Sequence, residues 1–225
     1  MVTRTLLADP AQRAPTTPDT APGGRGGIDA AWERCSALGL SRDLGGPRRV
    51  LADDDVGARR GDSPLARHVD VAADVLGLSA GPSEDRLAVI AGPDGTVLWR
   101  RGGKAALRRA DRLGFVEGAG WDEDGVGTNA IGQALLSGRP EELRGPEHFA
   151  LSHGDWDCTS APVRDPATGE VLGVLDLSGP RESATADTRH LVRSAARVLE
   201  ALLGGPGAAP STTAGPRLEL RLLAE

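Results

Sequence analysis

Tyrosine is absent from this sequence, and four Trp and two Phe residues bring the aromatic share to only 3%. A chain of 225 residues is long enough to bury the core of one domain with extra segments. Each of the few aromatic side chains is therefore expected to matter for packing. The two cysteines, Cys35 and Cys158, lie far apart in the sequence, and this excludes a disulfide framework.

Lysine is almost absent as well, since Lys104 is the single lysine among 26 basic residues, and the net charge is −6. Binding to duplex DNA depends on neutralising phosphates, so an acidic chain without a basic stripe does not favour DNA binding by itself. The sequence has no apolar run approaching the roughly 18 residues of a membrane span, and its start lacks the pattern of a signal peptide. We therefore expect a cytoplasmic protein that makes no membrane contact and reaches DNA only through a module outside this sequence.

Glycine and proline are plentiful, and most of the 31 Gly and 16 Pro lie outside the periodic segments. Residues 1–26 combine Pro, Thr and Gly and are predicted to form a disordered arm. Residues 27–80 show amphipathic helical spacing, and the main domain is predicted at 81–204. Residues 205–216 are typical of a flexible linker, and RLELRLLAE at 217–225 resembles the first strand of a further, truncated module.

Two hairpins are predicted in the main domain. The first joins apolar runs through the turn Gly92-Pro-Asp-Gly, and so short a turn requires antiparallel pairing. The second spans residues 156–177, and its return strand is nearly all apolar, as expected for a central strand. Asp176 interrupts that strand, so its carboxylate needs hydrogen-bond donors or a cavity. Helices alternate with these hairpins, which predicts an α+β fold.

The terminal helix is predicted at 185–203, and it has more apolar positions than one sheet surface needs. The excess predicts a parallel, helix-mediated homodimer.

The central feature is GAGWDEDGVGTNAIGQALLSG at 118–138, where a Gly-rich acidic loop leads directly into an amphipathic helix. Glycine lets the backbone turn sharply and lets a ligand approach closely. Thr128 and Asn129 are residue types that cap helices. Apolar residues, with Leu136 beside them, follow on one helical face, and Gly138 with Pro140 ends the helix. This junction is the best candidate for a binding site.

WDEDGVGTNAIGQAL, GRPEELRGPEHF and CTSAPVRDPATGEVLGVLDLSGP occur in that order. They resemble the sensory GAF domain of acetoin and glycerol catabolism transcription activators, and the resemblance covers about residues 27–204. It implies a five- or six-stranded antiparallel sheet, with N-terminal helices and a long C-terminal helix. The terminal helices would cover one face and ligand-pocket loops the other. It also implies a non-enzymatic sensory region of a bacterial transcription regulator.

We therefore expect a mostly apolar pocket between the central loop, a lid at 146–154 and the strand at 156–163. The candidate ligand-binding residues are Trp121, Asp124, Thr128, Asn129, His148, Phe149, Trp156, Cys158 and Ser160. Plain core packing explains Trp121 and Trp156 equally well, and helix capping alone explains Thr128 and Asn129.

Metal binding is not favoured. The acidic run at 122–124 lacks the alternating oxygen donors of an EF-hand. His148, His153 and Cys158 are spaced by five and lack the tight pairs of zinc sites. We expect neither a metal nor another cofactor.

Two alternatives remain open. GAF enzymes that reduce free methionine sulfoxide use several cysteines, whereas only Cys158 lies in the corresponding region, so a nucleophile there is the weaker alternative. The other alternative is a ligand-free module for dimerisation or for docking a protein partner. The favoured hypothesis is a sensor of a small-molecule effector or a partner protein.

Overall fold

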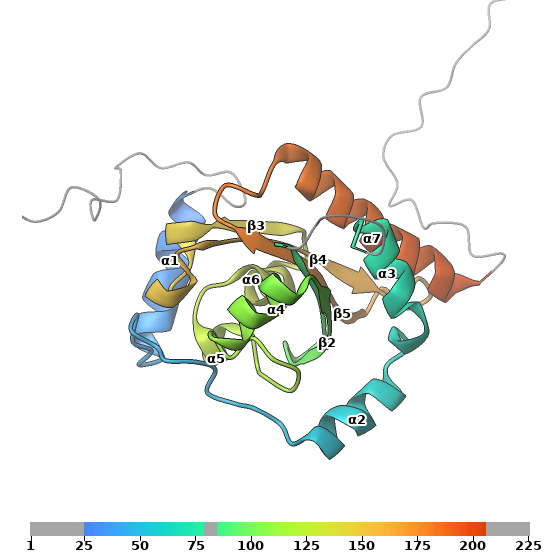
Figure 1. The fold of residues 1–225 in the computed structure, drawn as a ribbon, viewed down its shortest axis with the longest axis horizontal. Coiled ribbons are helices and arrows are strands. Elements are labelled where there is room, and N and C mark those ends of the chain that lie inside the picture. The colour runs from blue at the N-terminus through green and yellow to red at the C-terminus, as the bar shows by residue number, and fades with distance from the viewer. Residues whose placement is uncertain (1–24, 79–84, 206–225) are drawn as a thin grey trace, which may run out of the picture.

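A five-stranded antiparallel sheet forms the centre of the molecule, with strand order β2-β1-β5-β4-β3 (Figure 1). The computed structural model describes residues 25–78 and 85–205. The strands are β1 (Leu87–Ala91), β2 (Val97–Gly102), β3 (Glu141–Arg144), β4 (Trp156–Arg164) and β5 (Val171–Pro180). The predicted α+β fold and both predicted hairpins are confirmed, and the sheet has the smaller of the two expected strand numbers.

The central strand β5 pairs with β1 on one side and β4 on the other, as its apolar sequence predicted. Because side chains alternate along a strand, the sheet carries two separate cores. On one face Val89 and Val174 pack with Trp121 and Ile131. On the other face, residues such as Leu175 pack beneath the terminal helix.

Helices cover both faces of the sheet (Figure 1). Helices α3 and α7 lie together on one face, and the chain between β2 and β3, with α4, α5 and α6, covers the other. The α-helices are α1 (Arg25–Ala37), α2 (Asp53–Asp62), α3 (Val69–Val75), α4 (Lys104–Asp111), α5 (Glu123–Val126), α6 (Ala130–Ser137) and α7 (Ala186–Gly204). Short 3-10 turns form η2 (Ala66–His68), η3 (Gly145–Glu147) and η4 (Leu151–His153).

Helix α7 begins with a reciprocal cap. The Thr188 amide donates to Thr185 Oγ1 at 3.3 Å, and the Thr185 amide donates to Thr188 Oγ1 at 3.1 Å. These bonds satisfy amides that the first turn leaves free. Val192 and Leu199 then pack against the sheet, which fixes the helix on β4 and β5.

One detail of α6 differs from the prediction. Leu136 was expected beside the apolar face, but 63% of it is exposed. At about 100° per residue, Leu136 lies five positions after Ile131 and points well away from it. The face that packs on the sheet consists of Ala130, Ile131 and Ala134.

The ends of the chain bear on the predicted boundaries. Helix α1 begins at Arg25, so the last two residues of the predicted arm are helical. The rest of that arm, almost all of the predicted linker and the predicted further module lie outside the described residues. Within the described ranges, no helix combines the length and apolar content needed to cross a membrane.

Candidate functional site

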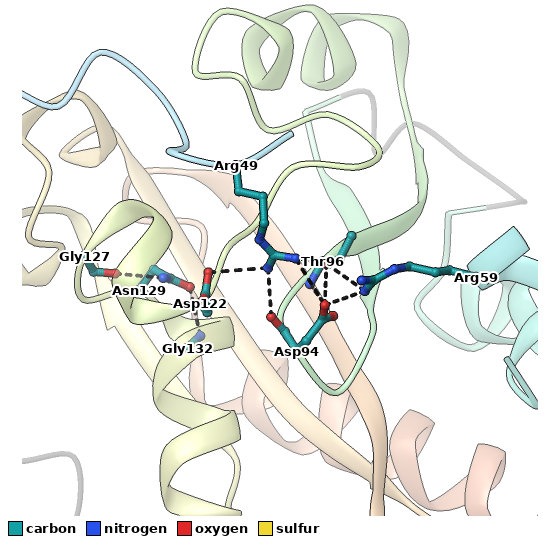
Figure 2. Close-up of polar contacts among 8 residues, drawn as sticks. All are labelled: Arg49, Arg59, Asp94, Thr96, Asp122, Gly127, Asn129 and Gly132. Carbon is teal, nitrogen blue, oxygen red and sulfur yellow. Dashed lines mark hydrogen bonds and ion pairs between the residues drawn. The ribbon is translucent and has the colours of Figure 1, made fainter. Parts of the chain in front are cut away.

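The central loop is tied to α6 by Asn129 (Figure 2). Asn129 Oδ1 accepts from the Gly132 amide at 3.0 Å, and Nδ2 donates to the Gly127 carbonyl at 2.8 Å. The prediction that Thr128 also caps the helix is wrong, because only the residue directly before the first helical one can be the N-cap. The Thr128 hydroxyl instead lies 3.3 Å from Cys35 Sγ of α1.

Glycine is required where this loop folds back under the lid. Gly127 has φ +78°, and a Cβ there would lie 2.6 Å from a ring carbon of Phe149. At Gly125 a Cβ would lie 2.4 Å from the Gly120 carbonyl oxygen. A larger residue at either position would therefore displace the backbone or the lid.

A buried polar row crosses the face of the sheet beneath this loop. Ser160 Oγ donates to Asp176 Oδ1 at 2.7 Å, and Ser178 Oγ donates to Asp176 Oδ2 at 2.6 Å. Cys158 Sγ lies 3.2 Å from the Ser178 hydroxyl. Burial raises the pKa of Asp176 to about 6, although the two hydroxyl donors oppose this rise. The carboxyl group that the sequence left without partners thus finds two donors.

A cluster of rings lies at the lid. The Trp121 indole stacks on the His153 imidazole with centroids 4.9 Å apart, and His148 meets His153 edge-on at 6.0 Å. Phe115 packs against Trp121 at 3.8 Å between centroids. Burial lowers the pKa of His148 and lowers that of His153 to about 3, so both imidazoles are neutral at neutral pH.

Helix α1 clasps the loop and the lid from outside. Trp32 Nε1 donates to the Glu147 carbonyl at 3.0 Å, and the Trp32 ring meets Phe149 edge-on. Arg34 binds the Glu123 carboxylate through two hydrogen bonds of 2.9 Å. Residues far apart in sequence therefore close over one side of the candidate site.

Beside the loop, Asp94 in the β1–β2 turn organises a second polar network (Figure 2). It accepts from Arg59, from Thr96 Oγ1 at 2.9 Å and from Arg49 at 3.2 Å. Partial burial alone would raise the pKa of Asp94, but these donors outweigh it and lower the pKa to about 2. These bonds hold the β1–β2 turn against Arg49 and Arg59, which precede the sheet in the sequence.

An open groove of about 420 Å³ borders this network. Asp94, Asp122 and Asp124 give its wall a negative charge that Arg49 partly offsets, and Leu135 adds apolar surface. Arg49 lies 3.9 Å from the Asp122 carboxylate, whose pKa is raised by burial.

The structure brings most of the predicted ligand-binding residues into the interior. Eight of them are buried: Trp121, Thr128, Asn129, His148, Phe149, Trp156, Cys158 and Ser160. Trp121, Trp156 and Cys158 belong to one core, whereas Phe149 packs with Cys35 and Leu40. Asp124 is exposed and lies apart from the others, on the open groove.

Sequence reasoning did not assign Ser178, Arg34 or Glu123 to the site. Alternation along β5 places Ser178 on the same face as Asp176, so this signal was available. The pairing of Arg34 with Glu123 spans 89 residues and has no local signal in the sequence.

The surroundings of Cys158 do not favour a nucleophilic sulfur. Burial and the nearby Asp176 raise the pKa of Cys158 well above its usual value, so its sulfur stays a thiol rather than a reactive thiolate. Within the described ranges, no three His, Cys, Asp or Glu side chains are grouped to hold a metal ion.

Comparison with known proteins places this geometry in a family. The family described as MimR, N-terminal domain, matches residues 31–201. The acetoin dehydrogenase operon transcriptional activator AcoR of Bacillus subtilis is 41% identical over 70% of this chain and 26% of its own length. The propane 2-monooxygenase operon transcriptional activator MimR of Mycolicibacterium smegmatis is 34% identical over 62% of this chain and 24% of its own.

The fold has a solved counterpart in the E. coli DhaR(N)–DhaL complex, with a TM-score of 0.71 and 25% identity over 78% of this chain and 60% of that one. The chain spans less than half the length of the curated relatives it matches. The resemblance seen in the sequence is confirmed: this chain belongs to the MimR N-terminal domain family, the GAF-like sensory domain of bacterial transcriptional activators.

Proposed function

We propose that this domain senses an effector, has no enzymatic activity of its own, and passes its state through α7 to a DNA-contacting or ATPase module outside this sequence. The named relatives activate operons for acetoin dehydrogenase and propane 2-monooxygenase, which supports a small organic effector from catabolism. Because these relatives activate operons, their function also supports a cytoplasmic location for this chain. DNA would be reached only through the output module. The eight buried candidate residues of the loop, lid and β4 are the proposed effector site, and Asp124, on the open groove, lies outside it.

The observation that carries this proposal is a pair of hydrogen-bonded links from the site to α7, one at each end of β4. At the first end the Asp157 carboxylate joins two segments. Its Oδ1 accepts from the Gly145 amide at 3.1 Å, and its Oδ2 accepts from the Ala184 amide at 3.3 Å. The start of the lid and the start of α7 therefore share one buried side chain.

At the other end of β4, Arg164 joins α6 to α7. Its Nη2 donates to the Gly138 carbonyl at 2.8 Å, where α6 ends. Its backbone amide donates to Glu200 Oε1 of α7 at 2.9 Å. A shift of α6 would therefore move the end of β4, which is also hydrogen-bonded to α7.

Sensing through these links is a shift between two arrangements of α7. An effector moves such an equilibrium only by the difference between its affinities for the two states. An effector that displaces the lid or α6 would favour one arrangement of α7, namely the one in which Asp157 and Arg164 keep their hydrogen bonds to the displaced segments.

A homodimer fits this role. On the outer side of α7, Val198 is 38% exposed and Leu202 is 43% exposed, four residues apart on one helical stripe. We propose that the same stripe of a second copy packs here in parallel, so that both output modules leave from one side.

A ligand-free docking module is the second candidate. The full burial of Ser160 and the packing of Trp121 between Phe115 and His153 favour it, because both side chains are in contact with protein neighbours. The complex formed by the relative DhaR(N) supports a protein as the effector.

Native mass spectrometry of the chain purified from its host tests the effector, followed by hydrogen exchange with and without the co-purifying species. We expect that species to slow exchange in residues 145–154 and 186–204 together. An Asp157→Asn/Arg164→Ala double variant keeps the effect at the lid and loses it in α7, whereas Arg139→Ala, an exposed arginine near Gly138, behaves as wild type. If the species binds and α7 exchange does not change in the wild type, the proposal is wrong. If only a protein co-purifies, the docking candidate replaces the small-molecule one.

A further inference from the structure

The connection between β5 and α7 holds one residue in a backbone conformation that glycine normally adopts. Glu182 has φ +70°, and the ten other described residues with positive φ are all glycines. For a residue with a side chain this conformation is unfavourable, because Cβ crowds the following carbonyl oxygen. Glu182 is exposed, and its carboxylate makes no hydrogen bond or ion pair within the described ranges that would offset this strain.

Glu182 occupies the third position of a tight turn at residues 180–183. The Ser183 amide donates to the Pro180 carbonyl at 2.9 Å, which closes the turn. Positive φ at the third position alone is the pattern of a type II turn, where glycine is the usual residue. The turn folds back on β5, because a Cβ on Gly179 would lie 2.4 Å from Ser183 Oγ. The sequence thus has a glycine beside the turn and lacks the one expected within it.

Neighbouring segments hold the turn in this conformation. The Arg181 amide donates at 2.9 Å to the carbonyl of Asp155, the second residue after the last 3-10 turn of the lid. The Ala184 amide, directly after the turn, donates to Asp157 Oδ2 at 3.3 Å. Strained backbone persists only where its surroundings fix it, and such residues cluster in switch regions. The end of the lid and the start of β4 therefore keep Glu182 strained.

We propose that Glu182 makes this turn a strained hinge between the lid and α7. This rests on the proposed function and adds a positioning residue to its route. While the lid is closed, the bond from Arg181 to Asp155 holds the turn. When the lid opens, that bond is lost and Glu182 returns to negative φ, which reorients Thr185, the N-cap of α7. The strain therefore raises the population of the arrangement in which the lid is open and α7 has moved.

Glu182→Gly tests the hinge, because glycine adopts positive φ without a Cβ penalty. Amide hydrogen exchange, followed by NMR on the full chain, measures how often each segment opens. We expect exchange to slow about fivefold in the turn, the lid and the start of α7 together, since the strain relieved exceeds the freedom that glycine gains on opening. The reporting amides are all hydrogen-bonded: Gly145, Leu151, Arg181, Ala184 and Arg189.

Two further variants separate backbone strain from other effects of the change. Glu182→Ala removes the carboxylate and keeps Cβ, so exchange at the reporting amides should stay within about twofold of wild type. Ala167→Gly introduces a glycine into the exposed β4–β5 turn, at a residue without positive φ, and should slow none of them. The Val97 amide, which donates to the Ala119 carbonyl, serves as the reference for the core.

The hinge is overturned if Glu182→Gly raises stability to urea and leaves lid exchange unchanged, because the strain would then be released only on unfolding. It is also overturned if Glu182→Gly and Glu182→Ala behave alike. Lid amides that exchange no faster than the Val97 amide would overturn it too, since the lid would then not open separately from the core.

These failures are distinct from failure of the sensing proposal. A co-purifying species that slows exchange in α7 would leave sensing through Asp157 and Arg164 intact even without the hinge. Conversely, Glu182→Gly could slow exchange in the lid and α7 while no species from the host changes α7. That result would support the hinge and contradict effector sensing.

Discussion

Burial of the Asp176 side chain changes the pH at which its carboxyl group titrates. Its pKa is about 6 in the folded chain, against an ordinary value of 3.8. Between these two values the folded state keeps a proton that the unfolded state has released, so the free energy of unfolding falls as pH rises through this window. A shift of about 2 units corresponds to about 3 kcal/mol at most.

Asp176→Asn should therefore be more stable than wild type at pH 8, by about 2 kcal/mol, and the difference should shrink towards pH 4. Urea unfolding at both pH values measures it. Asp74→Asn makes the same change at an exposed position on α3 and is the matched control, expected to stay within about 0.5 kcal/mol of wild type. A loss of equal size at both pH values would mean that Asp176 contributes through its hydrogen bonds and not through its titration.

Asn129 and Thr128 differ in role although both residue types cap helices. Asn129→Ala removes the bond to the Gly132 amide and should lower the free energy of unfolding by about 1 kcal/mol. Asn129→Asp keeps the acceptor and should recover most of that loss. Equal melting temperatures for wild type and Asn129→Ala would contradict the cap.

The sequence could predict that this pair begins a helix, because residue type and the following apolar period are local signals. It could not decide which residue is the cap. The helix begins at Ala130, which makes Asn129 the cap, and the Thr128 hydroxyl contacts Cys35, 93 residues away in the sequence.

Among the elements, the contact of α1 with the lid through Trp32 leads to a direct prediction. Trp32→Phe keeps an aromatic ring against Phe149 and removes the donor to the Glu147 carbonyl. Amides of residues 145–154 should then exchange faster, because opening of the lid loses one hydrogen bond worth about 1 kcal/mol. Hydrogen-exchange mass spectrometry measures this.

Leu38→Ala, an exposed position just after α1, is the control for this experiment and should leave lid exchange unchanged. Faster exchange confined to α1 itself, with the lid unaffected, would show that the clasp does not hold the lid.

Strands and helices were predictable from the sequence to a large extent, because periods of two and of about 3.6 residues report burial directly. The turn around Asp94 and the apolar run of β5 are examples. Contacts between elements were not predictable in this way. Trp32 meets the lid across 115 residues, and no local pattern encodes such a distance.

At the scale of the whole molecule, the two cores explain why the candidate site was only partly predictable. Motif order placed the loop, lid and β4 together, and the structure places Trp121, Trp156 and Cys158 in one core. Asp124 follows the same loop but lies on the outer groove, because it belongs to the exposed side of the short helix α5. A loop sequence does not show which side of such a turn faces inward.

The proposed dimer concerns exposed apolar residues on α7. Leu191, Val198 and Leu202 are spaced by seven and four residues, the spacing of a two-helix seam, and the last two are exposed. Leu202→Asp would place a charge in that seam and should convert a dimer to a monomer at micromolar concentration in sedimentation equilibrium. Leu136→Asp makes the same change at an exposed leucine of α6 and should leave the dimer intact. A wild-type chain that sediments as a monomer at high micromolar concentration would contradict the dimer. A Leu136→Asp variant that dissociates as readily as Leu202→Asp would contradict α7 as the interface, because a charge on α7 would then have no specific effect.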